Sequence, residues 1–428
     1  MVPQTLKQYA PSFKPEQWSE RDRRYLAPFA TNIDGLVHVL HNLPPEIVGA
    51  LCSRASRAKG SLLRILLNEY IYPILDGEDK ELSKELDYLV DFLTKHGFKN
   101  ILNNQRAQGF YAKWLSQYGD DSIAQMTGTH VVFWGISQVA MKFLEDQRIG
   151  LEPIEKSTRY VNFGEKINGK YLYYTPVPDL KKAGLLAEYK KTLDGLFETY
   201  NTLVPQLTQW LKKHYDEKDT VLEKKAFDTL RGLLPMATLG QVAFRGNAQA
   251  FEYLINRARM HELGELRWIA ETAKQELDTE IPSLLLRSVE EKSIAYQGYL
   301  SSVCNRVTRV LSQEAKKFLR QPTNVSQPTV ILAEYEHALE EKCIAGILYG
   351  LPNTHASWKD ILHSVQRMPK RAQEKILEAF FSNRSERWYK LGRAFENAYL
   401  RFDIVMDIGA YRDLHRHRML TQDRQTFS

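Results

Sequence analysis

Apolar residues recur at helical spacing along most of the chain, which predicts a helix-rich protein. The predicted helices cover residues 47–51, 62–72, 82–102, 136–143, 183–216, 222–243, 247–258, 263–280, 295–319, 329–350, 369–382 and 407–414. Two segments have the pattern of strands instead: residues 129–134 are rich in β-branched and aromatic side chains, and residues 398–404 alternate apolar with polar ones. Residues 171–175 form a third strand or extended segment. We therefore expect a helix-rich α+β or α/β chain.

Prolines and polar stretches indicate the domain boundaries. Residues 1–30 are polar and contain prolines, so we expect an N-terminal arm. Residues 321–328 hold two prolines among polar residues and are the best candidate for a linker. The predicted parts are an arm (1–30), a first domain (31–295), a helix and linker (296–328) and a second domain (329–428).

The order of elements after the linker repeats part of the order before it. A constant offset of 271 residues places Gln125 on Glu396, the first predicted strand on the second, and Glu145-Asp146-Gln147 on Arg416-His417-Arg418. Few residues are identical, but turn, strand and helix follow in the same order without gaps. The sequence therefore predicts a tandem repeat.

Composition narrows the class of protein. Of 428 residues, 58 are Lys or Arg and 52 are Asp or Glu, a mild positive balance, and 43% are hydrophobic, which excludes disordered and fibrous classes. No stretch is apolar for long enough to span a membrane, and the first residues do not have the pattern of a secretory signal. Three cysteines without a CxxC pair are no disulfide framework, so we expect a cytoplasmic protein.

Cationic residues gather in the run Arg412-Asp413-Leu414-His415-Arg416-His417-Arg418. So dense a patch is unfavourable unless an anion is close, and guanidinium groups match phosphate oxygens. The alternative is a solvated basic helix end, which the helix dipole would stabilise. His415 and His417 are two residues apart, the wrong spacing for one helical face, so we expect no metal site.

Two further motifs have the residue types of a phosphate site. In residues 155–160, backbone N–H groups, two hydroxyls and Arg159 can cradle a phosphate, while Glu155 can accept from a sugar hydroxyl or a base N–H. The alternative is a polar turn with a capping serine. Arg231 begins the apolar run Leu233-Leu234-Pro235, which is more simply core, and the arginine needs a partner if it is buried.

The order of these motifs resembles the flavin-dependent thymidylate synthases: strand, helix and R-H-R, then a loop ending in S-x-R-Y, then R-x-x-L-P and a helix with Asn and Arg. The resemblance covers residues 45–285 as one copy and 329–428 as part of a second, and so implies that family's fold in tandem. It implies methylation of dUMP to dTMP with FAD as cofactor, methylenetetrahydrofolate as carbon donor and NADPH as reductant. The family's enzymes are homotetramers with active sites between subunits, which implies self-association, here as a dimer of double-domain chains.

The resemblance also implies roles for individual residues. The nucleotide-binding positions are Glu155, Ser157, Thr158, Arg159 and Arg231, with either Arg257 or Arg259 in place of a later arginine. The flavin-side positions are Ser56, Ser122, Asn247, Glu396, Arg416, His417 and Arg418. Arg231 and Arg416 are expected to be catalytic, because the arginines orient and polarise the nucleotide and the chemistry needs no protein nucleophile.

Each copy departs from the family where the other matches it. The first has Glu145-Asp146-Gln147 in place of R-H-R, Asp120 in place of a histidine and Gln125 in place of a glutamate. The second has Glu396 and an intact Arg416-His417-Arg418, but only ten residues follow. We expect a fragment of a longer chain rather than a fused protein that has lost its helical half. We also expect the first copy to supply a nucleotide pocket and the second its cationic rim.

Two other functions compete with this one. A catalytically inactive or altered-substrate paralogue would bind nucleotide or flavin without methylating dUMP, in line with Asp120 and the altered loop after Arg418. A nucleic-acid-binding protein would use the basic residues 412–424, but acids are interspersed and no RNA- or DNA-binding motif is present. We therefore expect a dUMP-like nucleotide as partner, and neither membrane nor nucleic acid.

Overall fold

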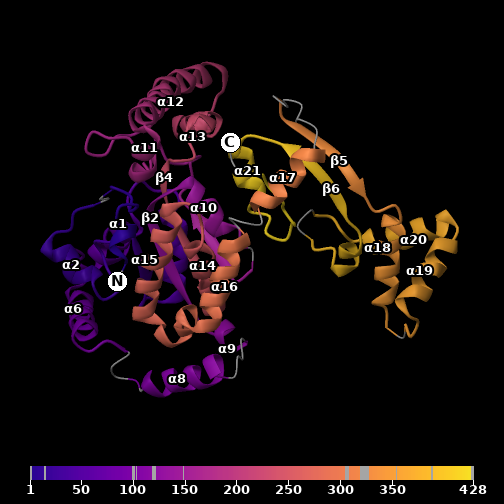
Figure 1. Cartoon of the computed structure of the whole chain (residues 1–428), viewed down its shortest axis with the longest axis horizontal. Helices are drawn as coiled ribbons and strands as arrows, with labels where there is room; N and C mark the ends of the chain where they lie inside the picture. The colour runs from indigo at the N-terminus through magenta and orange to yellow at the C-terminus, as the bar shows by residue number, and fades with distance from the viewer. Residues whose placement is uncertain are drawn as a thin grey trace. The chain divides into compact units, whose positions relative to one another are not determined.

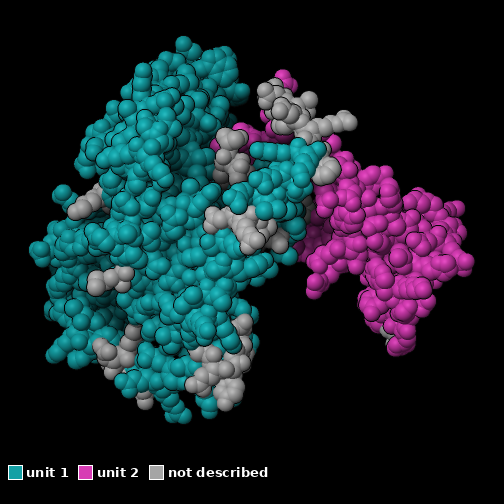
Figure 2. Space-filling view, in the orientation of Figure 1, with its two compact units in different colours: residues 1–320, 415–428 teal, residues 321–414 magenta. Residues whose placement is uncertain are grey.

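A computed structural model describes residues 2–13, 16–98, 102, 104–117, 122–147, 149–303, 308–318, 327–352, 354–386 and 389–425. The chain forms two compact units, Met1–Arg320 with His415–Ser428, and Gln321–Leu414 (Figure 2). Asp120, Cys304 and residues 321–326 of the predicted linker lie outside the described residues. The last residues of the predicted second domain, from His415 onward, are grouped with the first unit.

An antiparallel four-stranded sheet is the centre of the first unit. Its strands are β1 (Val37–Leu40), β2 (Gly128–Ser137), β3 (Leu151–Glu155) and β4 (Leu239–Asn247), in the order β1-β2-β4-β3. The register of β2 against β4 shifts between Trp134 and Ile136, where Gly135 has a φ of +73°. This bulge turns the end of β2 so that Ser137 caps the helix that follows.

Helices cover both faces of this sheet, so its strands are apolar on both sides. On one face, α10 (Gln138–Glu145), α14 (Ala248–Arg259) and α15 (Gly264–Glu280) pack on Val131, Phe133 and Phe244 (Figure 1). On the other face, α3 (Pro45–Ala55), α4 (Leu62–Ile65), the π-helical η1 (Leu66–Ile71) and α6 (Lys80–Lys95) pack on Leu40, Val132 and Ala243.

Two more helices carry a separate core. The hairpin of α12 (Leu186–His214) and α13 (Asp219–Leu230) packs Phe197, Tyr200 and Phe227 against Val161 and Phe163, just after β3. The remaining elements of this unit are α1 (Gln4–Lys7), α2 (Glu20–Leu26), α5 (Tyr72–Leu75), α8 (Asn104–Tyr111), η2 (Ala112–Gln117), α9 (Ser122–Gln125), α11 (Val177–Ala183), η3 (Arg231–Leu233), η4 (Pro282–Leu284), η5 (Leu286–Val289), α16 (Glu291–Ser302) and α17 (Thr308–Phe318).

The second unit joins a two-stranded antiparallel sheet to a helical core. Its elements are β5 (Thr329–Tyr335), α18 (Leu339–Tyr349), α19 (Trp358–Arg367), α20 (Lys370–Phe381), η7 (Arg393–Asn397), β6 (Leu400–Val405) and α21 (Ile408–Leu414). Ile344, Ile361 and Val365 are the buried centre of its helices. β6 and α21 begin 272 and 270 residues after β2 and α10, close to the predicted offset of 271, although the tandem repeat itself stays a prediction.

The helix-rich class with small sheets is as predicted, but two predicted helices are partly strands. Residues 239–243 belong to β4, and residues 329–335 form β5. β4 is buried along most of its length, and its sequence does not alternate apolar with polar residues, so a helix can share its pattern. Residues 171–175 contribute only an isolated bridge from Tyr173 to Thr238.

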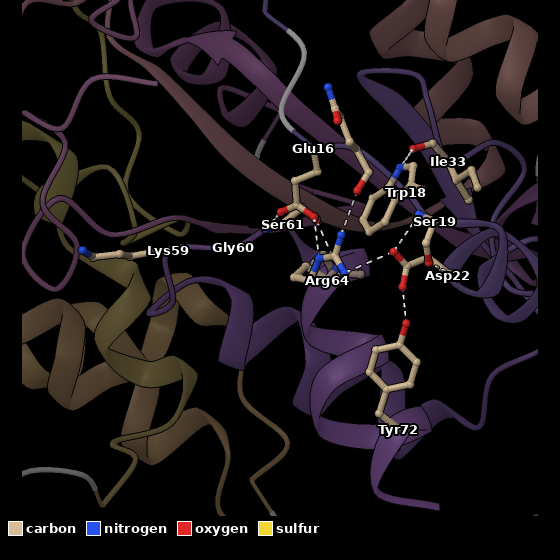
Figure 3. A network of polar contacts seen from close by, with 12 residues as sticks. Glu16, Trp18, Ser19, Asp22, Ile33, Lys59, Gly60, Ser61, Arg64 and Tyr72 are labelled. Carbon is tan, nitrogen blue, oxygen red and sulfur yellow. Dashed lines mark hydrogen bonds and ion pairs between the residues drawn. The ribbon is translucent and has the colours of Figure 1, made fainter. Parts of the chain in front are cut away.

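The N-terminal residues are packed more closely than an arm would be. Arg64 donates to Glu16 Oε2 at 3.1 Å and its guanidinium lies over the ring of Trp18 (Figure 3). Asp22, in α2, accepts from the hydroxyl of Tyr72. Polar side chains in this segment therefore fasten it to α4 and α5. Among the described residues, no helix combines the length and the hydropathy needed to cross a membrane.

Candidate functional site

A buried lysine, Lys156, fixes the position of the loop that follows β3. Lys156 donates to the carbonyl oxygens of Ala58, Lys59 and Gly60 at 2.7, 3.0 and 2.8 Å, and its Nζ lies 4.5 Å from the centre of the Trp134 ring. Burial lowers the pKa of Lys156 to about 7, whereas three carbonyl acceptors require three N–H donors and so favour the ammonium form. The lysine thus ties the end of β3 to the turn after α3.

Ser157 and Ser56 meet at this junction. The backbone N–H of Ser157 donates to the carbonyl of Ser56 at 2.8 Å, and the hydroxyl of Ser157 accepts from the backbone N–H of Arg159 at 3.2 Å. The hydroxyl of Ser56 donates to the carbonyl of Ser53, within its own helix end. Thr158 is buried. The loop is therefore preformed, with Arg159 at its outer side.

Two predicted nucleotide-binding arginines share one carboxylate. Arg159 Nε lies 3.2 Å from Asp228 Oδ2, and Arg231 Nε lies 3.2 Å from Asp228 Oδ1. Asp228 and Arg231 are three residues apart at the end of α13, so they lie on one side of the helix. The side chain of Arg231 is 12% exposed and that of Arg159 is 43% exposed. We call Arg159, Asp228 and Arg231 the arginine cluster; its net charge is +1.

The later arginines, at the end of α14, have different surroundings. Arg259 donates to both carboxylate oxygens of Glu271, at 2.6 and 3.2 Å, and to the carbonyl of Ser288 at 2.8 Å. The guanidinium of Arg257 lies 4.7 Å from the ring centre of Phe143. The bidentate ion pair gives Arg259 a structural role, which leaves Arg257 as the better match to the family's later arginine.

An acid cluster lies on the other side of the loop. It consists of Lys142, Glu145, Asp146 and Glu155. Lys142 Nζ is 2.5 Å from Glu145 Oε2 and 3.3 Å from Glu155 Oε2, and the three side chains are only 1%, 7% and 4% exposed. Buried carboxylates need cations at close range, and one lysine supplies only one positive charge to this cluster.

The residues His415 to Arg424, which we call the basic segment, pack on this acid cluster. Arg416 Nη2 lies 3.5 Å from Glu155 Oε1, and Arg418 donates to the carbonyl of Pro153 at 3.3 Å. His417 is exposed, and its carbonyl accepts from the backbone N–H of Leu420. The structure thus brings Glu155 of the loop together with Arg416, 261 residues later in the chain.

The predicted flavin-side residues have different surroundings. Asn247 caps α14 and lines a cleft of about 580 Å³ together with Gln125, Gln147 and Tyr296. Ser56 lies at the 157 loop, and Ser122 begins α9. Glu396 belongs to the second unit, where it pairs with Arg393 at 3.1 Å.

The cleft does not offer the charge that FAD requires. FAD carries a diphosphate, which cationic groups or free N–H groups must neutralise. In the lining, Arg287 is paired with Glu252 at 2.7 Å, and the lining holds both Lys292 and Glu290. The described residues that line this cleft therefore do not by themselves match the charge of the FAD diphosphate.

Sequence reasoning missed three residues that organise the site: Lys142, Lys156 and Asp228. A lysine inside the apolar run from Val139 to Phe143 was a signal for Lys142, because a buried lysine needs an acid, and Glu145 follows three residues later. Asp228 precedes Arg231 by the same helical spacing. Nothing in the local sequence indicates the three carbonyl partners of Lys156.

Known proteins resemble this chain over both units. Residues 82–283 match a family model described as thymidylate synthase complementing protein. A UPF0159 protein of Chlamydia pneumoniae is 36% identical over 427 residues, which cover 97% of this chain and 76% of the relative. A UPF0159 protein of Chlamydia muridarum is 35% identical over 424 residues, covering 96% and 76%. A third, from Thermoplasma acidophilum, is 26% identical over 353 residues, covering 74% and 67%.

Proposed function

Because the chain belongs to the thymidylate synthase complementing protein family, a flavin-dependent family, we propose that it binds a dUMP-like pyrimidine nucleotide at the arginine cluster and acts in thymidylate synthesis. The observation that carries this proposal is the sharing of Asp228 by Arg159 and Arg231. Two guanidinium groups with one carboxylate keep a positive surplus, which suits the dianionic phosphate of a nucleotide.

Different residues of the loop would bind different parts of the nucleotide. Arg231 and Arg159 would hold the phosphate, with backbone N–H groups and hydroxyls of Ser157 and Thr158 nearby. Glu155, at the other end of the same loop, would accept from the sugar or the base. Arg416 lies beside Glu155 and would place positive charge against the base, where charge develops when a pyrimidine ring is activated.

The finer proposal is methylation of dUMP to dTMP, with methylenetetrahydrofolate as carbon donor and NADPH as reductant. FAD would carry the hydride when it is bound. Because the described lining of the cleft at Asn247 does not match the charge of FAD, this reaction would need the cleft to be completed by a second copy of the chain. The self-association of double-domain chains is therefore part of the proposal.

Titration calorimetry with dUMP tests the nucleotide site directly. We expect Arg231→Gln to lower dUMP affinity roughly 10- to 100-fold, because a partly buried charge-assisted bond is lost. Arg245→Gln is the matched control, since Arg245 is 66% exposed and pairs with Glu152 across β3 and β4. Equal dUMP affinity in wild type and Arg231→Gln would contradict the proposed site.

A second candidate is a paralogue that binds nucleotide without turnover. It is favoured by the contrast between the assembled arginine cluster and the flavin-side residues, which have different surroundings. Tritium release from 5-labelled dUMP in the presence of FAD, NADPH and methylenetetrahydrofolate separates the two. Release above that of Arg231→Gln supports methylation, whereas dUMP binding without release supports the paralogue.

A further inference from the structure

The acid cluster carries more negative charge than its own elements can neutralise. Glu145, Asp146 and Glu155 come from the end of α10 and the end of β3, and among the described residues of this stretch Lys142 supplies the cation in contact with Glu145 and Glu155. Glu145 and Glu155 are almost fully buried, where a carboxylate without a cation is strongly unfavourable. The arrangement therefore requires further cations from elsewhere in the fold.

The basic segment supplies these cations at specific atoms. His415 Nε2 lies 3.0 Å from Asp146 Oδ1, and His415 Nδ1 lies 3.5 Å from Glu145 Oε2. Arg424 Nη2 lies 2.6 Å from Asp146 Oδ2. With Arg416 at Glu155, two arginines and Lys142 balance the three carboxylates, and protonated His415 adds a fourth positive charge.

From this complementarity we propose that Glu145 and Asp146 are positioning residues, which hold the basic segment on α10 and β3 and thereby place Arg416 beside Glu155. The acidic residues stand where the resembling family has R-H-R, and three cations there would repel the basic segment. The first copy can therefore bind the basic segment of the second copy only because it lacks R-H-R at these positions. Docking of the segment is independent of the proposed function; only the consequence for nucleotide binding rests on it.

Limited trypsin digestion of the full chain measures the docking. Trypsin cleaves after Arg416 and Arg418. Both sites lie between His415 and Arg424, which bind Asp146, so a docked segment is protected from cleavage. We expect Asp146→Asn to raise the rate of cleavage at these two sites roughly tenfold, because it removes the charge that binds both His415 and Arg424. Glu152→Gln is the matched control: Glu152 lies on β3, the strand that ends at Glu155, but pairs with Arg245.

A charge exchange distinguishes positioning from a general loss of structure. Asp146→Lys and Arg424→Glu should each release the segment, and the two changes together should restore protection to within roughly threefold of wild type. Cleavage after Arg245, inside β4, reports global unfolding and should stay constant throughout. Wild-type protection in Asp146→Asn, or a double variant cleaved as fast as the single ones, would overturn the proposal.

The dUMP affinity of Asp146→Asn then tests the consequence for the site. Weaker dUMP binding together with a released segment supports the placement of Arg416 by Asp146. If the segment is released and dUMP affinity is unchanged, the placement of Arg416 by Asp146 has no role in nucleotide binding, and this consequence of the proposal is overturned. If the wild-type chain does not bind dUMP, the proposed function fails, and the digestion and charge exchange still decide whether the acidic pair holds the segment.

Discussion

The arginine cluster and the acid cluster lie at opposite ends of one loop and differ in charge balance. In the arginine cluster two guanidinium groups meet one carboxylate, and Arg159 and Asp228 are 43% and 37% exposed. In the acid cluster the carboxylates are matched by Lys142 and the basic segment, and Lys142 is only 1% exposed. Both are ion-pair networks, but Asp228 of the arginine cluster is far more exposed than Glu145 and Glu155 of the acid cluster, which are 7% and 4% exposed.

This difference distinguishes a ligand-binding site from an ion-pair network that stabilises the fold. A partly exposed cluster with surplus charge can exchange its internal carboxylate for an anion, since each exposed ion pair contributes little on its own. A buried, balanced cluster cannot lose a member without leaving a charge unpaired. We therefore expect substitution of the buried Lys142 to act on folding, and substitutions in the arginine cluster to act on ligand affinity.

Replacing Lys142 should have the largest effect on stability. In Lys142→Met, the buried carboxylates of Glu145 and Glu155 lose their shared cation, and we expect the free energy of unfolding to fall by about 3–5 kcal/mol. Urea denaturation followed by circular dichroism measures this. Lys84→Met is the control, because Lys84 is 76% exposed and should show no measurable change. A loss below about 1 kcal/mol in Lys142→Met would mean that the cluster is not balanced by this lysine.

The sequence predicts much of the fold because its helices and its alternating strands carry a clear period. Residues 129–134 were expected as a strand and belong to β2, and residues 369–382 were expected as a helix and include α20. β4 was missed, because it is buried on both faces and keeps no alternation. The short strand β1 was missed as well: it has only four residues, all buried.

The candidate site was predicted in its residue types but not in its partners. Glu155, Arg159 and Arg231 were chosen as single positions, and the structure adds the contacts that relate them. Asp228 joins two of them, and Arg416 reaches the third from 261 residues away. Such contacts depend on tertiary packing, which the local periodicity of apolar and polar residues does not determine.

Removing the internal carboxylate of the arginine cluster should have a smaller effect of opposite sign. In Asp228→Asn, a phosphate no longer competes with a carboxylate for Arg159 and Arg231, so we expect affinity for inorganic phosphate and dUMP to rise roughly three- to tenfold. Calorimetric titration of both ligands measures it. Asp219→Asn, on the exposed start of the same helix, is the control. Weaker binding in Asp228→Asn would show that the carboxylate holds the arginines in position rather than competing with the ligand.

The smallest expected effect is on the pH dependence of the docked segment. Burial lowers the pKa of His415, but its hydrogen bonds to Asp146 and Glu145 outweigh burial and nearby Lys142, so its pKa is raised above 6.5. Burial raises the pKa of Asp146, yet its bonds to His415 and Arg424 lower it overall, so Asp146 stays ionised near neutral pH.

A histidine whose pKa is raised in the docked state contributes its stabilisation fully below its undocked pKa and loses it as the pH rises through the docked value. Tryptic cleavage after Arg416 and Arg418, corrected for the pH dependence of trypsin on an unfolded peptide, should therefore rise by roughly two- to fivefold between mildly acidic and mildly alkaline pH. The change is modest because Arg424 stays charged and keeps its bond to Asp146 throughout. His415→Gln should abolish the pH dependence while keeping part of the protection. A pH dependence that persists in His415→Gln would place the titrating group elsewhere, and the acid cluster would then be balanced by its arginines and lysine alone.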